Sequence, residues 1–291
     1  EPAELGERCY QFEDVHFAYN EAEILHGISF QTQPGTMTAI VGPSGSGKST
    51  IAKLMAGFWD VTSGTVHFGG QDIRSIPLSV LRENIACVPQ ENLLFSDTIQ
   101  SNIAFGTRTI DKMPPLEQKP MKVFIRGTEA AEEWVEQEMS QRESENDRYW
   151  NDLDAVMDAA KDADVHDNIM DFPHQYATVV GERGVTLSGG QKQRTAIARG
   201  LMKDAQILIL DDALSAVDTD TEARILSALK ARRAGKTTIL IAHRISTVQN
   251  ADQILLIENG ICAESGTHQQ LIQKEDGLYR RVYDIQTRKD A

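Results

Sequence analysis

Short apolar runs recur near both ends of the chain, separated by polar and glycine-containing segments. Residues 10–19 and 24–32 are rich in Phe, Val and Ile with partial alternation, which predicts two strands. The runs at 37–41, 207–210 and 237–242 are almost wholly apolar. Runs of that kind are typical of strands buried on both faces of a parallel sheet.

Helical patterns lie between these strands. One is predicted from residue 48 to 55, stopping at Gly57, and another from 221 to 231. The alternation of strands and helices predicts an α/β core with a parallel sheet. From about 97 to 185 there is little strand signal, and helices are predicted from Thr128 through Met139 and from 152 to 169.

Composition excludes several classes of protein. The net charge of −14 and pI of about 4.9 argue against nucleic acid as the main ligand, because phosphate backbones need clustered Lys and Arg. Mean hydropathy is −0.35 and no apolar run approaches the roughly 18–20 residues of a membrane span, so a soluble domain is expected. Three widely spaced cysteines fit a reducing cytosol. The missing initiator Met suggests a piece of a longer chain, although processing would look the same.

The sequence that follows the third strand carries a phosphate-binding loop. It reads Gly42, Pro43, Ser44, Gly45, Ser46, Gly47, Lys48, Ser49, Thr50 and opens a predicted helix. The glycines allow a tight turn that aims several backbone N–H groups at one phosphate, and the helix N-terminus adds its positive dipole. We expect Lys48 to be a solvent-exposed cation of this surface loop that reaches the β- and γ-phosphates, and the Ser49 hydroxyl would ligate Mg²⁺.

Such a loop does not choose among kinases, GTPases and ATPases, but a second motif does. Residues 187–191 read Leu-Ser-Gly-Gly-Gln, followed by Lys-Gln-Arg. With this signature the chain resembles the ABC ATPases, and the resemblance covers nearly its whole length. A P-loop kinase would have no use for the signature. The resemblance implies that Ser188, Gly189, Gly190 and Gln191 bind the γ-phosphate of an ATP held by a second subunit's P-loop.

Further positions match the family in the expected order. The resemblance implies that Tyr19 stacks on adenine, that Gln90 touches Mg²⁺ and senses the membrane domain, and that Asp211 holds Mg²⁺ through water. It also implies that residues 215–218 form a dimer-contact loop. His243 matches the switch histidine that contacts the γ-phosphate.

Asp212 departs from the family pattern, which has Glu at this catalytic position. Asp is one methylene shorter, so its carboxylate is expected to fall roughly 1–1.5 Å short, and a misplacement of about 1 Å can cost on the order of 100-fold in rate. The alternative is that the backbone adjusts and restores the reach. The combination of an intact signature with a shortened acid favours a heterodimer with one slow and one fast ATP site, and a homodimer stays open.

Four segments resemble exporter-type members of the family: residues 95–103, 179–184, 241–247 and 266–268. In such proteins a six-helix membrane domain usually belongs to the same chain. The segment of about 107–150 is longer than the family usually carries, and both a partner-binding or regulatory segment and a neutral insertion are open.

The resemblance implies a P-loop NTPase core with a parallel sheet, an antiparallel β subdomain and an inserted α-helical subdomain. We expect the core in residues 1–95 and 186–291 and the helical subdomain, with the insertion, in residues 96–185. The implied function is an ATPase that powers export with ATP and Mg²⁺ at the cytoplasmic face of the cell membrane. Its catalytic residues would be Gln90, Asp212 and His243, and its metal ligands Ser49, Gln90 and Asp211. The alternative is an ABC ATPase of DNA repair or the ribosome that moves nothing.

Overall fold

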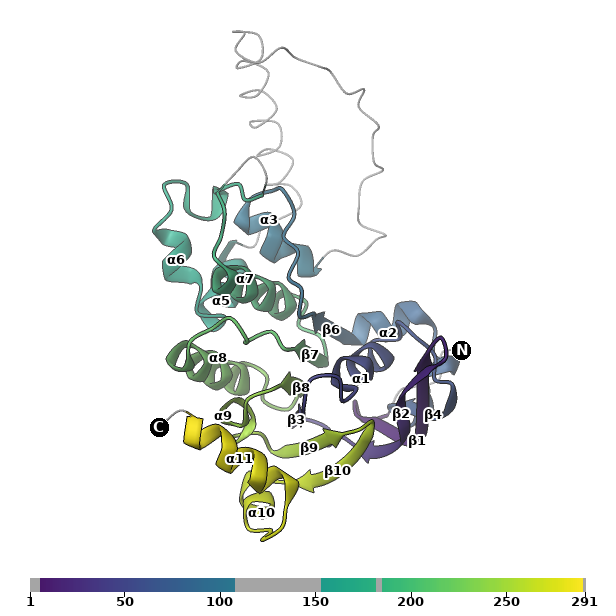
Figure 1. Cartoon of the computed structure of the whole chain (residues 1–291). Helices are drawn as coiled ribbons and strands as arrows, with labels where there is room; N and C mark the ends of the chain where they lie inside the picture. Colours follow the sequence, from purple (N-terminus) through teal and green to yellow (C-terminus); the bar gives the residue numbers. More distant parts are fainter. Residues whose placement is uncertain (1–5, 108–152, 182–184, 290–291) are drawn as a thin grey trace.

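The computed structural model describes residues 6–107, 153–181 and 185–289 (Figure 1). The strands are β1 (Tyr10–Tyr19), β2 (Ala22–Gln31), β3 (Met37–Val41), β4 (Ser63–Phe68), β5 (Gln71–Asp72), β6 (Ile85–Val88), β7 (Ile207–Asp211), β8 (Thr237–Ala242), β9 (Gln253–Glu258) and β10 (Ile261–Gly266). The α-helices are α1 (Lys48–Met55), α2 (Leu78–Asn84), α3 (Ile99–Ala104), α5 (Leu153–Asp162), α6 (His166–Met170), α7 (Gly189–Met202), α8 (Thr219–Arg232), α9 (Ile245–Val248), α10 (His268–Ile272) and α11 (Leu278–Lys289).

In these ranges no helix combines the length and the apolar character that a membrane span requires. The helix predicted from Thr128 lies outside the described residues.

A six-stranded sheet in the order β10-β9-β3-β8-β7-β6 forms the centre of the molecule. Five of its strands run parallel, and β10 pairs antiparallel with β9 at one edge. The register sets Val41 beside Ala242, and Asp211 beside Ile241, so β3, β8 and β7 end at the same edge of the sheet. The predicted α/β class with a parallel sheet is confirmed.

The apolar strands divide their side chains between two faces, as the period of two requires. In β7, Leu208 and Leu210 join one buried cluster while Ile207 and Ile209 join the other, and β8 divides in the same way. Because both faces are covered, these strands read as continuous apolar runs instead of alternating ones.

An antiparallel sheet in the order β2-β1-β4-β5 covers one face together with α1. Buried aromatic residues fill this layer, and the Tyr10 hydroxyl donates a hydrogen bond to the Met55 carbonyl at 2.7 Å. β2 begins at Ala22, two residues before the predicted start, because Asn20 adopts a left-handed φ of 56° and closes a tight turn after β1.

Helices α3, α5 and α7 pack together on the other face, and α8 lies beside them (Figure 1). The single helix expected over 152–169 is wrong, because α5 ends at Asp162 and α6 begins at His166. Asp164 between them has a φ of 54°, which a continuing right-handed helix cannot accommodate. The division into residues 1–95, 96–185 and 186–291 stays a prediction.

Candidate functional site

The loop of residues 42–47 joins the end of β3 to the start of α1, as the motif predicts. Gly47 has a φ of 102°, and a Cβ there would lie 2.6 Å from Leu25 Cδ2, so both backbone and space require glycine. Gly47 is also the N-cap of α1 and offers no side chain to the first N–H groups of the helix. The buried Ser46 hydroxyl makes no hydrogen bond with any described residue. Donors without partners at a helix N-terminus are the chemistry that a phosphate needs.

Lys48 is the first residue of α1, and its side chain points into the loop. It is only 4% exposed, and its ammonium donates to the carbonyls of Gly42 at 2.8 Å and Pro43 at 2.7 Å. Our expectation of a solvent-exposed loop lysine was therefore wrong. Burial lowers the pKa of Lys48, and the nearby Asp212 and Asp211 carboxylates oppose that shift. The Lys48 ammonium is thus enclosed by the loop, where it faces the carbonyls of Gly42 and Pro43.

Oxygen-bearing side chains converge where the parallel strands end. The Ser49 hydroxyl donates to Asp211 Oδ1 at 2.9 Å, joining the start of α1 to the end of β7. Asp211 is 7% exposed, and burial is the main cause that raises its pKa, with the Asp212 carboxylate adding to the rise. A hydroxyl and a buried carboxylate within hydrogen-bond distance are hard oxygen ligands, and they fit Mg²⁺.

Asp212 and Gln90 meet beside this pair. Gln90 Nε2 donates to Asp212 Oδ2 at 3.2 Å, so the segment after β6 reaches the end of β7. Asp212 adopts a left-handed φ of 51°, and its N–H donates to the Ile241 carbonyl in β8 at 3.0 Å. The backbone here is constrained by the neighbouring strand, which fixes where the carboxylate begins.

His243 follows β8 and lines a small cavity of about 90 Å³ with Asp212, Ser215, Arg244 and Thr247. The structure therefore brings the candidate catalytic residues Asp212 and His243 to one cavity, and joins Gln90 to Asp212. A crevice beyond the carboxyl ends of parallel strands is where α/β proteins bind ligands.

Tyr19 ends β1 at the flank of α1. Its ring meets those of Phe17 and Trp59 edge-on, with centroids 4.8 and 5.8 Å away, and the Lys53 ammonium of α1 lies 5.8 Å from its centroid. Trp59 itself is 53% exposed. These contacts hold the aromatic ring of Tyr19 next to α1, the helix that follows the phosphate loop.

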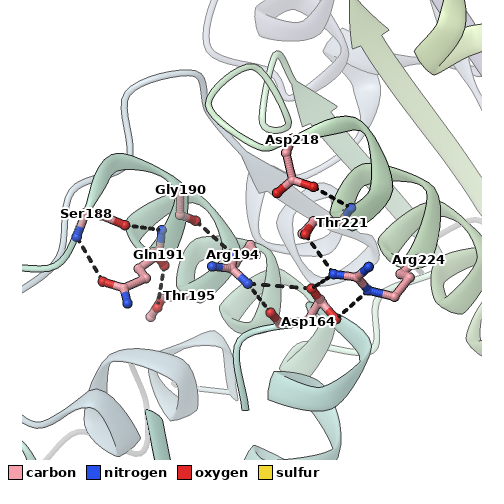
Figure 2. Close-up of polar contacts among 9 residues, drawn as sticks. All are labelled: Asp164, Ser188, Gly190, Gln191, Arg194, Thr195, Asp218, Thr221 and Arg224. Carbon is pink, nitrogen blue, oxygen red and sulfur yellow. Dashed lines mark hydrogen bonds and ion pairs between the residues drawn. The ribbon is translucent and has the colours of Figure 1, made fainter. Parts of the chain in front are cut away.

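The signature residues form the start of α7. Ser188 is the N-cap, its hydroxyl accepts from the Gln191 N–H at 3.2 Å, and the Gln191 side chain accepts from the Ser188 N–H at 3.0 Å (Figure 2). This is a complete capping box, which gives the turn a defined shape. Within the described ranges, no hydrogen bond or ion pair joins residues 188–191 to the loop of residues 42–50.

The signature helix is instead tied to the segment of residues 215–218. Gln193 of α7 donates to the Ser215 hydroxyl at 2.9 Å and accepts from the Ala216 N–H at 2.8 Å. A Cβ on Gly190 would lie 3.0 Å from the Ala216 carbonyl, so the two segments touch. Two of the sequence motifs thus form a second group, which touches the first where the Ser215 hydroxyl donates to the Asp212 carbonyl at 2.9 Å.

A three-helix clamp that the sequence motifs did not reveal supports this group (Figure 2). The Asp164 carboxylate accepts from Arg224 Nε at 3.1 Å and Nη2 at 2.9 Å, and its carbonyl accepts from Arg194. Arg224 also donates to the Thr221 hydroxyl, and the Thr221 N–H is capped by Asp218. The clamp joins the α5–α6 junction to the starts of α7 and α8. The sequence signal for this clamp is Asp164 itself, because Asp tolerates a left-handed backbone that interrupts a helix more readily than most residues.

Two of the exporter-like segments lie side by side. Thr98 and Val179 form an antiparallel bridge, and the Val180 N–H donates to the Asp97 carbonyl at 3.0 Å. Exposed apolar side chains lie in or just before these segments: Leu93, two residues before the first segment, is 79% exposed, Phe95 is 47% and Val179 is 36% exposed. Residues 182–184 of the second segment lie outside the described residues.

Comparison with known proteins agrees with the geometry. Residues 25–215 match the family model described as "ABC transporter". The chain is 43% identical over 277 residues to the "ATP-dependent lipid A-core flippase" of Saccharophagus degradans, covering 95% of this chain and 40% of the relative. It is 41% identical over 277 residues to the human "ATP-binding cassette sub-family B member 6", covering 95% of this chain and 28% of the relative.

A solved structure titled "Structure of a bacterial Atm1-family ABC exporter with ATP bound" superposes with a TM-score of 0.79. It is 40% identical in sequence, and the match covers 98% of this chain and 43% of that chain. The chain therefore spans about two fifths or less of the length of these relatives.

Asp211→Asn is expected to stabilise the domain without nucleotide or Mg²⁺ while removing Mg²⁺-dependent ATP hydrolysis. The raised pKa means that ionising Asp211 costs more in the folded than in the unfolded state. The cost is present above the folded pKa and disappears as pH falls through it. Asparagine keeps the acceptor for Ser49, so we expect a gain of about 1 kcal/mol in the free energy of unfolding at pH 7, shrinking at acidic pH.

Urea unfolding between pH 4 and 7 would measure this difference, with exposed Asp158→Asn as the matched control. Equal stability of the two variants and the parent at every pH would contradict the argument from burial.

Proposed function

The chain belongs to the ABC transporter family, and from this premise we propose that it is the ATP-binding and hydrolysing domain of an ATP-driven exporter. The observation that carries the proposal is the convergence of Lys48, Ser49, Gln90, Asp211 and Asp212 at the carboxyl ends of the parallel strands. The relatives named above include a flippase and an exporter. No DNA-repair or ribosome-associated protein is among those relatives, and the acidic surface does not favour nucleic acid.

The loop N–H groups and Lys48 bind the β- and γ-phosphates, and Tyr19 supports the adenine ring. Ser49 and Asp211 hold Mg²⁺, with Gln90 beside them, and the ion supplies charge neutralisation on the phosphate oxygens. Asp212 orients the attacking water, and His243 faces the γ-phosphate. In phosphoryl transfer such positioning and charge stabilisation supply most of the catalysis.

A second ATP-binding domain completes each site. The signature and the residues 215–218 are tied together by Gln193, and no hydrogen bond or ion pair of the described residues joins them to the phosphate loop of residues 42–50. Residues Ser188 to Gln191 therefore serve an ATP held by the other domain, whose signature in turn covers the loop here. The partner has a different sequence in this proposal. Asp212 weakens the local site, which this chain's own phosphate loop forms, whereas the intact signature of this chain serves the opposite site, which the partner's phosphate loop forms.

A membrane domain supplies the other partner and belongs to the full-length protein. The paired segments around Thr98 and Val179, with exposed Leu93 and Phe95, offer an apolar surface to its intracellular helices. The ATP-binding domain then lies at the cytoplasmic face of the membrane. The exported compound contacts the membrane domain, so the residues of this chain do not determine which compound is exported.

Lys48→Ala is expected to abolish productive ATP binding, since it removes the cation enclosed by the phosphate loop. The test compares the melting temperature of each variant with and without Mg²⁺ and ATP, so that any change in intrinsic stability cancels. At 100 times the dissociation constant, binding stabilises the parent by about 2.7 kcal/mol. Exposed Lys161→Ala should respond like the parent. An equal ATP-induced shift in Lys48→Ala would refute the proposed phosphate site.

Asp212→Glu is expected to raise hydrolysis at the local site by roughly 10- to 100-fold, because the added methylene extends the carboxylate toward the water. The assembled transporter is assayed with Ser188→Arg in this chain, which silences the partner's site and leaves the local one visible. Exposed Asp220→Glu is the matched control. A homodimer with fast, symmetric hydrolysis through Asp212 would overturn both the slow-site assignment and the heterodimer.

A further inference from the structure

The C-terminal helix α11 reaches back to the turn that carries His243. Gln286 Nε2 donates to the His243 carbonyl at 3.0 Å, and the Ile245 N–H donates to Gln286 Oε1 at 2.8 Å. One amide group thus bridges the turn between β8 and α9, from its first residue, His243, to Ile245, the first residue of α9. The two bonds also fix which end of the amide is oxygen, since each end has a single suitable partner.

This turn lacks a cap of its own. The N-cap of α9 is Arg244, whose side chain makes no capping hydrogen bond. Its guanidinium instead donates to the Leu214 carbonyl at 3.3 Å and pairs with the buried Glu222 carboxylate at 3.4 Å. A helix start leaves N–H groups that need acceptors, and Gln286 supplies one from 41 residues away.

Helix α11 is itself well anchored, so it can hold the turn. The Glu264 carboxylate of β10 accepts from the N–H groups of Leu278 at 3.2 Å and Tyr279 at 3.0 Å at the helix start. Tyr279 is fully buried, and its hydroxyl lies 2.8 Å from His268 Nδ1. Figure 1 shows α11 lying across α9 and leading from the edge strand β10 toward the chain end.

The imidazole of His243 makes no hydrogen bond with any residue in the described ranges. Its direction therefore depends on the backbone of the turn, which Gln286 holds. We propose that Gln286 is a positioning residue for His243, so that the C-terminal helix sets how well the ATP site hydrolyses its substrate. This inference rests on the proposed function, since it gives His243 a role at the γ-phosphate.

The experiment measures Mg²⁺-ATP turnover of the assembled transporter in lipid nanodiscs, with Ser188→Arg in this chain in every sample so that the partner's site is silent and the local site alone is measured. Gln286→Met keeps the length of the side chain but loses both hydrogen bonds, and Gln286→Glu keeps the acceptor for Ile245 alone. Asp284→Asn, exposed on the same helix, is the matched control. We expect kcat to fall roughly tenfold in Gln286→Met and less in Gln286→Glu, with ADP affinity unchanged within about twofold.

A double-mutant cycle with His243→Ala separates positioning from general loss of stability. If Gln286 acts through His243, adding Gln286→Met to His243→Ala lowers the residual kcat by less than about twofold. A parental kcat in both Gln286 variants would overturn the inference. An equal fold-loss of kcat on adding Gln286→Met to the parent and to His243→Ala would overturn it as well. Where Gln286→Met fails to fold, the Gln286→Glu arm of the same cycle decides. Absence of Lys48-dependent ATP hydrolysis in the parent would instead refute the proposed function.

Discussion

The parallel alignment of β3, β6, β7 and β8 is the constraint on which the rest of the structure depends. Parallel strands end at one edge, so the phosphate loop, Gln90, Asp211 and His243 meet there although they are spread over two hundred residues. The strands hold this alignment because both of their faces are buried, one against α1 and the antiparallel sheet and the other against the helical layer. Backbone register, more than any single side-chain contact, assembles the site.

Features that depend on local pattern could be predicted from the sequence. The strand–loop–helix unit around Lys48 and the helix start at Ser188 are encoded in glycines and caps within a few residues. Burial of Lys48 was missed, because whether a loop lysine points outward or back to its own carbonyls depends on the fold around it. The break at Asp164 was missed for a similar reason. Its left-handed backbone is stabilised by Arg194 and Arg224 from two distant helices, which no local pattern reveals.

The two groups of motif residues differ in what supports them. The residues around Lys48 and Asp211 depend on the sheet, whereas the signature depends on Gln193 and on the clamp at Asp164. His243 stands between these groups, since Arg244 contacts the segment after Asp212 and Gln286 holds the turn from outside. Under the proposed function, the turn that carries His243 would therefore connect the local ATP site with the segment after Asp212 and with the C-terminal helix.

The central claim is that ATP is enclosed between the phosphate loop of this chain and the signature of a second domain. A cryo-EM structure of the assembled transporter with excess ATP and Mg²⁺, using Asp212→Asn to slow turnover, tests it most directly. The account predicts nucleotide density that touches Lys48 and Ser49 on this chain and signature residues of the partner domain, with Ser188 facing the partner's nucleotide. Density that contacts Ser188 and Lys48 of the same domain, or a signature left in solvent beside bound ATP, would contradict it.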